Sequence, residues 1–339
     1  MALSRKSFLS TTSLGFTSLF IADWNVFYSR YESTEIIKPK RLPKGATLGL
    51  IAPASPIYLQ SDFEFMIKAL TDLGYKLVLG DHVKDRNGYL AGSDEDRAAD
   101  LHKMFINPNI DGILCIRGGY GSNRILDLID FEVIKNNPKP FIGFSDITSL
   151  HLAIFKNTGL ITFHGPVGKS QWNNFTVNSW NSVLHLAEAP SYTIPEDQTD
   201  AFVIKSGSAE GTLLGGNLTV LTSLLGSNYL PDFDGAILFL EDIGEDIYRI
   251  DRMLSQLKLN GILNKINGFV FGKCTDCSES SNSLTLKQVL DDYILPLNIP
   301  AFYGAMISHE EQNLTIPVGL PASIDADLKT INILEPAVL

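Results

Sequence analysis

Ser145 is the first residue of this sequence whose position suggests chemistry. It follows the apolar run Pro140–Phe144, which predicts a buried strand, and apolar residues at helical spacing come after it. A serine at a strand-to-helix turn exposes its hydroxyl above the first helix amides, a geometry that suits an acyl-transfer nucleophile. Only half of the usual elbow motif is present, because Gly143 lies two residues before the serine but Ile147 lies two after. The alternative is that Ser145 only caps the helix.

A nucleophilic serine needs a base within hydrogen-bond reach. Of the six histidines, two lie in segments from which they could reach a site. His164 ends a short predicted strand, and His309 lies in a polar loop before Leu314–Gly319. The residue types and spacing alone do not rank these two candidates.

An acid that orients the base is expected at the end of a strand. Glu241 directly follows the apolar run Ala236–Leu240, and open α/β sheets hold functional groups at the carboxyl ends of their strands. Asp242 and Glu245 are rivals for this role. The alternative is a solvated acidic loop.

The segment Arg117-Gly-Gly-Tyr-Gly121 could supply donors for an oxyanion. It follows a predicted buried strand, and its glycines allow backbone N–H groups to approach a ligand closely. Such a loop could also bind phosphate, but no Gly-Lys-Ser/Thr ending and no complete Gly-x-Gly-x-x-Gly motif is present. The sequence therefore disfavours a nucleotide-hydrolysing or dinucleotide-dependent enzyme.

The elements that must position these residues alternate between strands and helices. Apolar runs at 46–52, 75–79 and 112–116 predict strands, with helical segments between them, the second capped by Ser93. This alternation predicts an α/β fold with an open, mainly parallel sheet and helices on both faces. At 339 residues the chain exceeds the usual size of one hydrophobic core, so two domains are expected.

The expected domain boundaries follow changes in composition. Residues 1–43 are interpreted as an export signal and tether, and residues 44–187 as the α/β domain that carries Ser145. Residues 188–208 are loop-like and are expected to form a linker. Residues 209–339 are expected to form the carboxyl-terminal domain.

The amino terminus resembles an export signal. Ser4-Arg5-Lys6-Ser7-Phe8-Leu9 is similar to a twin-arginine motif in which lysine replaces the second arginine, and a mildly apolar stretch follows. We therefore expect export to the periplasm, with a Sec signal or a cytoplasmic protein as the alternatives. No run in the sequence approaches the ~20 apolar residues of a membrane span. The net charge is −11 and no basic cluster stands out, so nucleic acid is not an expected partner.

Three cysteines, Cys115, Cys274 and Cys277, cannot all pair with one another. The last two have the spacing of half a zinc site, but no second pair completes it. A pair of loop thiols is the preferred interpretation, and export would allow a disulfide between them.

Taken together, these segments resemble the L,D-carboxypeptidase family of serine peptidases, which includes murein tetrapeptide carboxypeptidases and microcin C self-immunity peptidases. The matches occur in the family's order and cover nearly everything from residue 46 onward. They are Gly49–Pro56, Arg117–Gly121, Ile142–Thr148, His164–Pro166, Gly211–Asn217, Leu240–Glu245, Tyr248–Arg252, Ile307–His309 and Leu314–Gly319. One departure is Ser308, where many relatives carry glycine before the histidine.

The resemblance implies a fold and a set of roles. It implies an α/β amino domain and a carboxyl domain with a small sheet or barrel, with Ser145 as nucleophile, His309 as base and Glu241 as its orienting acid. The implied oxyanion hole uses the backbone N–H of Asp146 and that of Gly118 or Gly119. Arg117 or Arg249 is the candidate to bind the free carboxylate of a substrate.

The resemblance also implies an activity. That activity is metal-independent and cofactor-independent hydrolysis of the amide between the L-centre of a diamino acid and a terminal D-alanine in murein stem peptides. The alternatives are a peptidase for a peptide-nucleotide antibiotic and a non-catalytic muropeptide-binding protein. Trp172 and Trp180, in an expected loop at 170–182, could stack on a nucleobase or simply pack. The expected partner is a small peptide, and a homodimer is left open.

Overall fold

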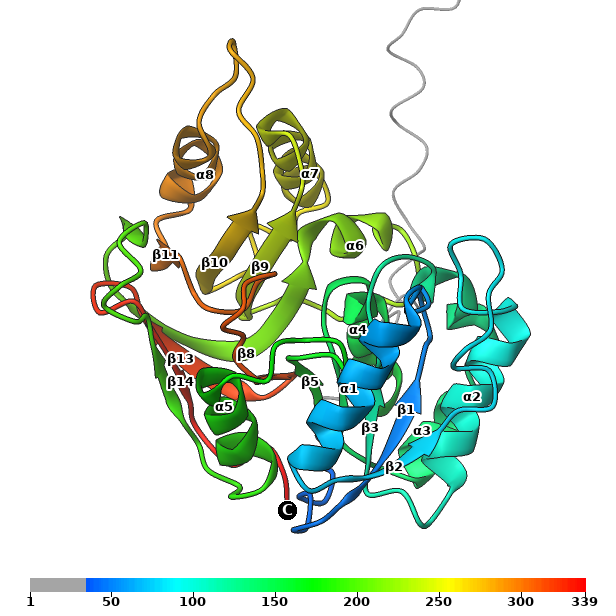
Figure 1. The fold of residues 1–339 in the computed structure, drawn as a ribbon. Helices are drawn as coiled ribbons and strands as arrows, with labels where there is room; N and C mark the ends of the chain where they lie inside the picture. Colours follow the sequence, from blue (N-terminus) through cyan, green and yellow to red (C-terminus); the bar gives the residue numbers. More distant parts are fainter. Residues whose placement is uncertain (1–34) are drawn as a thin grey trace, which may run out of the picture. The chain divides into compact units, whose positions relative to one another are not determined.

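The structure, a computed structural model, describes residues 35–339 (Figure 1). The expected export signal lies outside these residues, and the expected tether is described only from Glu35 onward. The last part of that tether packs on the fold, because Leu42 is buried and its N–H donates to the carbonyl of Leu184 at 2.8 Å. No helix within the described part is long and apolar enough to cross a bilayer.

The first sheet has six strands in the order β12-β5-β4-β3-β1-β2. The strands β1 to β5 are parallel, as the sequence predicts, and β12 pairs antiparallel with β5. Their bounds are β1 (Thr47–Ile51), β2 (Lys76–Leu79), β3 (Gly112–Cys115), β4 (Phe141–Gly143), β5 (Thr162–His164) and β12 (Ile316–Val318). The strand order reverses at β1, which has β2 on one side and β3 on the other, and such a switch point is where open sheets bind ligands.

Helices connect these parallel strands. Right-handed crossovers place the connection from β1 to β2 on one face and the later connections on the other. The connections are α1 (Gln60–Asp72), α2 (Asp94–Ile106), η1 (Ser122–Leu128) with α3 (Phe131–Asn136), and η2 (Ser145–Ile147) with α4 (Thr148–Thr158). The Ser93 side chain caps α2 by accepting from the N–H of Asp96, as the sequence predicts. The α/β fold class with helices on both faces is therefore confirmed.

The second sheet has eight strands in the order β6-β14-β13-β8-β9-β10-β11-β7, more than the small sheet that the resemblance implies. Its centre, β8 to β11, is parallel, and its flanks are antiparallel. The strands are β6 (Ser191–Thr193), β7 (Phe202–Lys205), β8 (Ser208–Asn217), β9 (Ile237–Ile243), β10 (Gly268–Thr275), β11 (Ala301–Tyr303), β13 (Pro321–Asp325) and β14 (Thr330–Ile333). The segment expected as a linker, 188–208, contains both edge strands.

Three helices and a short 3₁₀ segment accompany this sheet. They are α6 (Leu218–Ser223), α7 (Ile247–Leu259), α8 (Leu286–Ile294) and η3 (Leu295–Leu297). Figure 1 shows α7 and α8 packed side by side near β9 and β10. The α7 helix begins directly after β9, so the acidic segment between them lies at the carboxyl end of that strand.

One expected loop is a helix. Residues 170–182 contain most of α5 (Asn174–Leu184), which Asn173 caps by accepting from the N–H of Thr176. The sequence of α5 is rich in Asn, Ser and Thr, which have low intrinsic helix propensity, so its helical state depends on tertiary packing. Trp180 is buried and meets Trp172 edge-on at 5.2 Å between ring centroids. The two tryptophans therefore pack together.

Glycines near the end of β8 allow close approach to the neighbouring strand β9 and to the helix α4. A Cβ on Gly215 would lie 1.7 Å from the carbonyl oxygen of Phe239 in β9, and a Cβ on Gly216 would lie 2.4 Å from Oγ1 of Thr148 at the start of α4. The next residue, Asn217, donates its N–H to that same Oγ1 at 2.9 Å. The end of β8 is thus joined to the helix that follows Ser145.

We expect Gly215→Ala to lower the free energy of unfolding by about 3 kcal/mol or more, because the added methyl overlaps a strand backbone that cannot move aside. Gly88→Ala is the matched control, since Gly88 also has positive φ (+63°) but no atom lies within 4 Å of its added Cβ. The control should cost about 1 kcal/mol. Urea unfolding curves compare the two, and equal losses would contradict the steric explanation.

Candidate active site

Ser145 lies at a sharp turn between β4 and the 3₁₀ segment that leads into α4. Its φ is 64°, in the left-handed region that a serine rarely adopts, while Phe144 before it is extended. Gly143 at the end of β4 leaves little room for a larger residue, because a Cβ there would lie 3.0 Å from the side chain of Ile147. The isoleucine that replaces the second motif glycine therefore packs directly on the first one. Strained turns of this kind are found at functional sites.

The glycine-rich loop after β3 packs against this turn. A Cβ on Gly118 would lie 2.9 Å from Cβ and 3.2 Å from Oγ of Ser145, so only glycine allows this approach. The Asp146 carboxylate accepts from the N–H of Ser122 at 2.8 Å, and the Ser122 hydroxyl donates to the Asp146 carbonyl at 2.5 Å. These bonds fix the loop and the turn relative to each other.

Glu241 and His309 form a hydrogen-bonded pair. Nδ1 of His309 lies 2.8 Å from Oε2 of Glu241. Because a carboxylate only accepts, Nδ1 carries the hydrogen, and Nε2 of a neutral His309 is left as the proton acceptor. Glu241 lies within β9 and is fully buried, and Nδ2 of Asn217 donates to its other oxygen at 3.1 Å.

The His309 imidazole lies against the residue that precedes Ser145. Its ring centroid is 4.8 Å from that of Phe144, and His309 and Ser145 line the same cavity. Burial lowers the pKa of His309, but the charge of Glu241 and its hydrogen bond outweigh burial and hold the pKa above its ordinary value. Both side chains are largely shielded from water, because only 16% of the His309 side chain and 0% of the Glu241 side chain are exposed.

His164, the other candidate base, occupies a structural position. It is fully buried, and its Nε2 donates to the carbonyl of Ile307 at 2.8 Å. Burial lowers the pKa of His164, which keeps the ring neutral. His164 thus supports the loop that carries His309 and has no access to a ligand.

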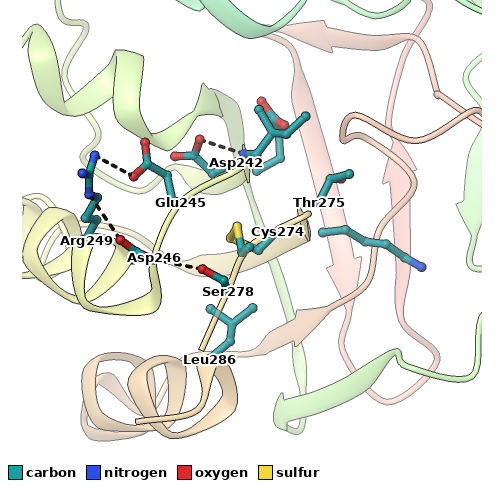
Figure 2. The surroundings of a disulfide bond; sticks show 12 residues. Asp242, Glu245, Asp246, Arg249, Cys274, Thr275, Ser278 and Leu286 are labelled. Atoms are coloured by element: carbon teal, nitrogen blue, oxygen red, sulfur yellow. Dashed lines mark hydrogen bonds and ion pairs between the residues drawn. A yellow bond between two sulfur atoms is a disulfide. The ribbon is translucent and has the colours of Figure 1, made fainter. Parts of the chain in front are cut away.

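The loop that carries His309 is held by the end of β10. The Lys273 N–H donates to Oγ of Ser308 at 2.5 Å, and the Thr275 hydroxyl donates to Glu310 at 2.8 Å. Ser308, which stands where many relatives carry glycine, therefore stabilises the loop by accepting this hydrogen bond through its hydroxyl oxygen. A disulfide between Cys274 and Cys277 closes the adjacent turn, as the sequence suggests for an exported protein (Figure 2).

Ser145 lies on the walls of two cavities. The first, which we call the His309 cavity, has a volume of about 540 Å³ and is lined by Ser145, His309, the Arg117–Gly119 loop and Lys169 among others. The second, which we call the Glu245 cavity, has a volume of about 320 Å³. Its walls include Ser145, Asp146, Asn123, Asn217, Asp242 and Glu245. The three residues expected to supply the oxyanion hole are among those that line these cavities: Gly118 and Gly119 line the first, and Gly119 and Asp146 line the second.

The structure separates the two arginines expected to bind a carboxylate. Arg117 lines the His309 cavity, where its Nη1 donates to the carbonyl of Pro56 at 3.0 Å. Arg249 is not among the residues that line either cavity beside Ser145. Figure 2 shows Arg249 paired with Glu245 and Asp246. Its side-chain nitrogens lie 3.6 Å from the Glu245 carboxylate and 3.9 Å from that of Asp246.

Two residues of this site escaped the sequence analysis. Lys169 lines the His309 cavity, paired with Asp62 at 2.8 Å. Asn217 orients Glu241 and also donates to Asp242 at 3.1 Å. The sequence analysis included Asn217 only as the last residue of the matched segment Gly211–Asn217. For Lys169, the surrounding sequence gives no signal of a role in the site.

One group among the described residues has metal-ligand chemistry. His82, Asp85 and Asp96 place ligand atoms within 4.8 Å of one another. The two imidazole nitrogens face different carboxylates, with Nδ1 at 2.9 Å from Asp85 and Nε2 at 3.5 Å from Asp96. The hydrogen bond to Asp85 and the ion-pair contact with Asp96 explain this arrangement, and none of the three residues lines a cavity beside Ser145.

Comparison with known proteins identifies the family. A family model described as the LD-carboxypeptidase N-terminal domain matches residues 48–165, and one described as the C-terminal domain matches residues 210–324. The chain is 42% identical to a probable murein peptide carboxypeptidase of Bacillus subtilis, over 86% of this chain and 93% of that protein. It is 33% identical to a murein tetrapeptide carboxypeptidase of Pseudomonas aeruginosa, over 84% of this chain and 95% of that protein.

Solved structures agree with this result. The microcin C7 self-immunity protein in its apo state superposes with a TM-score of 0.83 at 30% identity, covering 89% of this chain and 100% of that one. A muramoyltetrapeptide carboxypeptidase from Oxalobacter formigenes superposes with a TM-score of 0.74 at 31% identity, covering 85% of this chain and 97% of that one. The chain therefore belongs to the LD-carboxypeptidase family and is a carboxypeptidase, a hydrolase of amide bonds.

Proposed function

We propose that the protein is a serine L,D-carboxypeptidase that removes the terminal D-alanine from murein stem peptides. The observation that supports this most is the Glu241–His309 hydrogen bond at the wall of a cavity that also contains Ser145, held at a strained turn. Two relatives are named as murein peptide or tetrapeptide carboxypeptidases. These two facts favour an amide in a stem peptide as the substrate.

The proposed mechanism uses only residues of this chain. Nε2 of His309 takes the proton of the Ser145 hydroxyl while Oγ attacks the carbonyl carbon of the scissile amide. Glu241 holds the imidazole in the required tautomer and stabilises the imidazolium that forms. Backbone N–H groups of Asp146 and of Gly118 or Gly119 stabilise the oxyanion.

The intermediate then collapses and the amide C–N bond breaks. The His309 imidazolium gives its proton to the leaving amine, and D-alanine departs. Water, deprotonated by His309, hydrolyses the acyl enzyme and restores Ser145. The reaction requires no metal ion, and Arg117 and Lys169, both on the wall of the His309 cavity, provide cations for the terminal carboxylate of the substrate.

Replacing the nucleophile tests the assignment directly. We expect Ser145→Ala to lower kcat for D-alanine release from a murein tetrapeptide by at least ~10³-fold, because the acyl enzyme cannot form. A chelator should leave wild-type turnover unchanged. Ser191→Ala, on an exposed edge strand, is the matched control and should retain the wild-type rate. Equal turnover by Ser145→Ala and the control would disprove the nucleophile assignment.

The pH profile tests the Glu241–His309 pair. The base must be neutral, so kcat/KM should fall as the pH drops through the His309 pKa, which lies above the ordinary value of about 6.5. Glu241→Gln keeps an acceptor but removes the negative charge that raises this pKa. In the Glu241→Gln variant, we expect the acid limb of the kcat/KM pH profile to move to lower pH, and the maximal rate to fall by about 10²–10⁴-fold. An acid limb that stays in place would show that Glu241 does not act on the base.

We also propose that the protein is exported. The twin-arginine-like residues Ser4–Leu9 and the Cys274–Cys277 disulfide support this, since disulfides persist in oxidising compartments. Fusing residues 1–43 to a reporter that is active only outside the cytoplasm should give a signal. Replacing Arg5 and Lys6 by glutamine should abolish it, and a reporter that stays silent with the unaltered segment would contradict export.

A further inference from the structure

A third cavity lies at the edge of the first sheet opposite Ser145. Parallel strands end at a common edge, and Ser145 and the Arg117–Gly121 loop follow the carboxyl ends of β4 and β3. The third cavity, which we call the basic groove, has a volume of about 920 Å³. Its walls include residues that come shortly before the amino ends of β1, β3 and β4, namely Lys44, Asp111 and Lys139. A ligand in the basic groove therefore does not obstruct the candidate active site.

The walls of the basic groove are positively charged, although the protein as a whole has a net charge of −11. Among the described residues, five lysines and arginines line the groove, against the Asp111 side chain and the terminal carboxylate of Leu339. Asp111 is occupied, because it accepts from the N–H of Thr47 at 2.7 Å. Burial lowers the pKa of His185, which also lines the groove, so its imidazole adds no charge. Positive charge therefore prevails.

Two of the five cations already have partners. Lys38 forms an ion pair with Glu335 at 3.2 Å, and Lys139 donates to the carbonyl of Met104 at 2.9 Å. The other three, which we call the groove cations, are exposed and form no ion pair with an acid among residues 35–339. They are Lys40, Arg41 and Lys44. The groove cations are available to an anionic group from outside.

The backbone that carries the groove cations is fixed to the fold. Leu42 is buried, and its N–H donates to the carbonyl of Leu184 at 2.8 Å. The N–H of Arg41 donates to the carbonyl of Leu339 at 3.0 Å. In return, the N–H of Leu339 donates to the carbonyl of Pro39 at 2.9 Å. Because this backbone is already ordered, binding an anion costs only the ordering of side chains.

Exposed apolar side chains line the same groove. Ile106 at the end of α2, Leu186 after α5 and Leu339 at the carboxyl terminus are 55%, 60% and 73% exposed. Basic and aliphatic side chains on one surface suit an anionic lipid layer, where the cations meet phosphates and the aliphatic groups meet the acyl boundary. A nucleic acid or a charged sugar polymer would engage the cations but leave the aliphatic side chains in water.

We propose that the basic groove binds anionic phospholipids of a membrane surface and holds the enzyme there as a peripheral protein. The lipid phosphates contact the groove cations, and the aliphatic side chains enter the boundary between headgroups and acyl chains. The amino-terminal segment joins the fold at this same edge, because Ile37 pairs with Leu160, just before β5. Ser145, at the opposite edge of the sheet, then faces away from the membrane and toward soluble peptides.

Co-sedimentation of the full chain with lipid vesicles tests the proposal. We expect the protein to bind vesicles that contain phosphatidylglycerol and phosphatidylcholine, and to bind vesicles of phosphatidylcholine alone at least about tenfold more weakly. The triple variant Lys40→Gln/Arg41→Gln/Lys44→Gln should bind the anionic vesicles about 100-fold more weakly than the wild type, at about fivefold for each cation. This variant should still release D-alanine from a soluble tetrapeptide at the wild-type rate, since Ser145 lies at the other edge.

The matched control removes the same charge from another surface. Lys258→Gln/Lys287→Gln/Arg252→Gln alters exposed cations of α7 and α8. This control should bind anionic vesicles as the wild type does. All variants are compared at a temperature at which circular dichroism shows them to be folded. Equal loss of binding by the two triple variants would overturn the proposal, because binding would then follow net charge and not the groove.

Leu186→Ser distinguishes a lipid surface from a soluble polyanion. It should weaken binding to anionic vesicles by about threefold or more, because an aliphatic group no longer enters the acyl boundary while the groove cations remain. It should leave the binding of heparin, a soluble polyanion, unchanged. Wild-type binding that is equal for anionic and neutral vesicles would contradict the proposal. Binding of heparin without binding of vesicles would also contradict it, and would assign the groove to a polyanion.

Discussion

The hydrogen bond between Glu241 and His309 is the interaction on which the site depends. A fully buried carboxylate is costly unless its oxygens are satisfied, and here His309 and Asn217 satisfy them. Both partners belong to the carboxyl-terminal half of the chain, whereas Ser145 belongs to the first sheet. The site therefore combines elements of both sheets, and the close approach of β8 to α4 at Gly216 is one of the contacts that join them.

Much of the first sheet could be predicted from the sequence because its signals are local. Continuous apolar runs mark parallel strands, Ser93 marks the start of α2, and the change from strand to helix period marks the turn at Ser145. The parts that could not be predicted depend on tertiary contacts. The strand β8 ends in glycines, which have low strand propensity, and α5 is rich in residues of low helix propensity, so its buried face, which includes Trp180, contributes to its helical state.

The same distinction applies to the candidate site. Glu241 could be placed at its strand because the apolar run before it is local information. His164 and His309 could not be ranked, because what separates them is burial and the position of a carboxylate distant in sequence. Arg249 looked available in the sequence, yet two neighbouring acids occupy it in the structure. Electrostatic partners of this kind are decided by the fold.

Asn217 shows why the second half of the site is rigid. Its Oδ1 caps α6 by accepting from the N–H of Val220 at 3.0 Å, its Nδ2 donates to Glu241 and Asp242, and its N–H donates to Thr148. An aspartate could keep the cap, but it would place a third carboxylate beside two that already repel each other. Burial and the charge of Glu241 raise the pKa of Asp242 to about 6, which shows how strained this acidic pair is even with an amide between its members. Only a residue that accepts at one end and donates at the other can both cap the helix and donate a hydrogen bond to the carboxylate that orients His309.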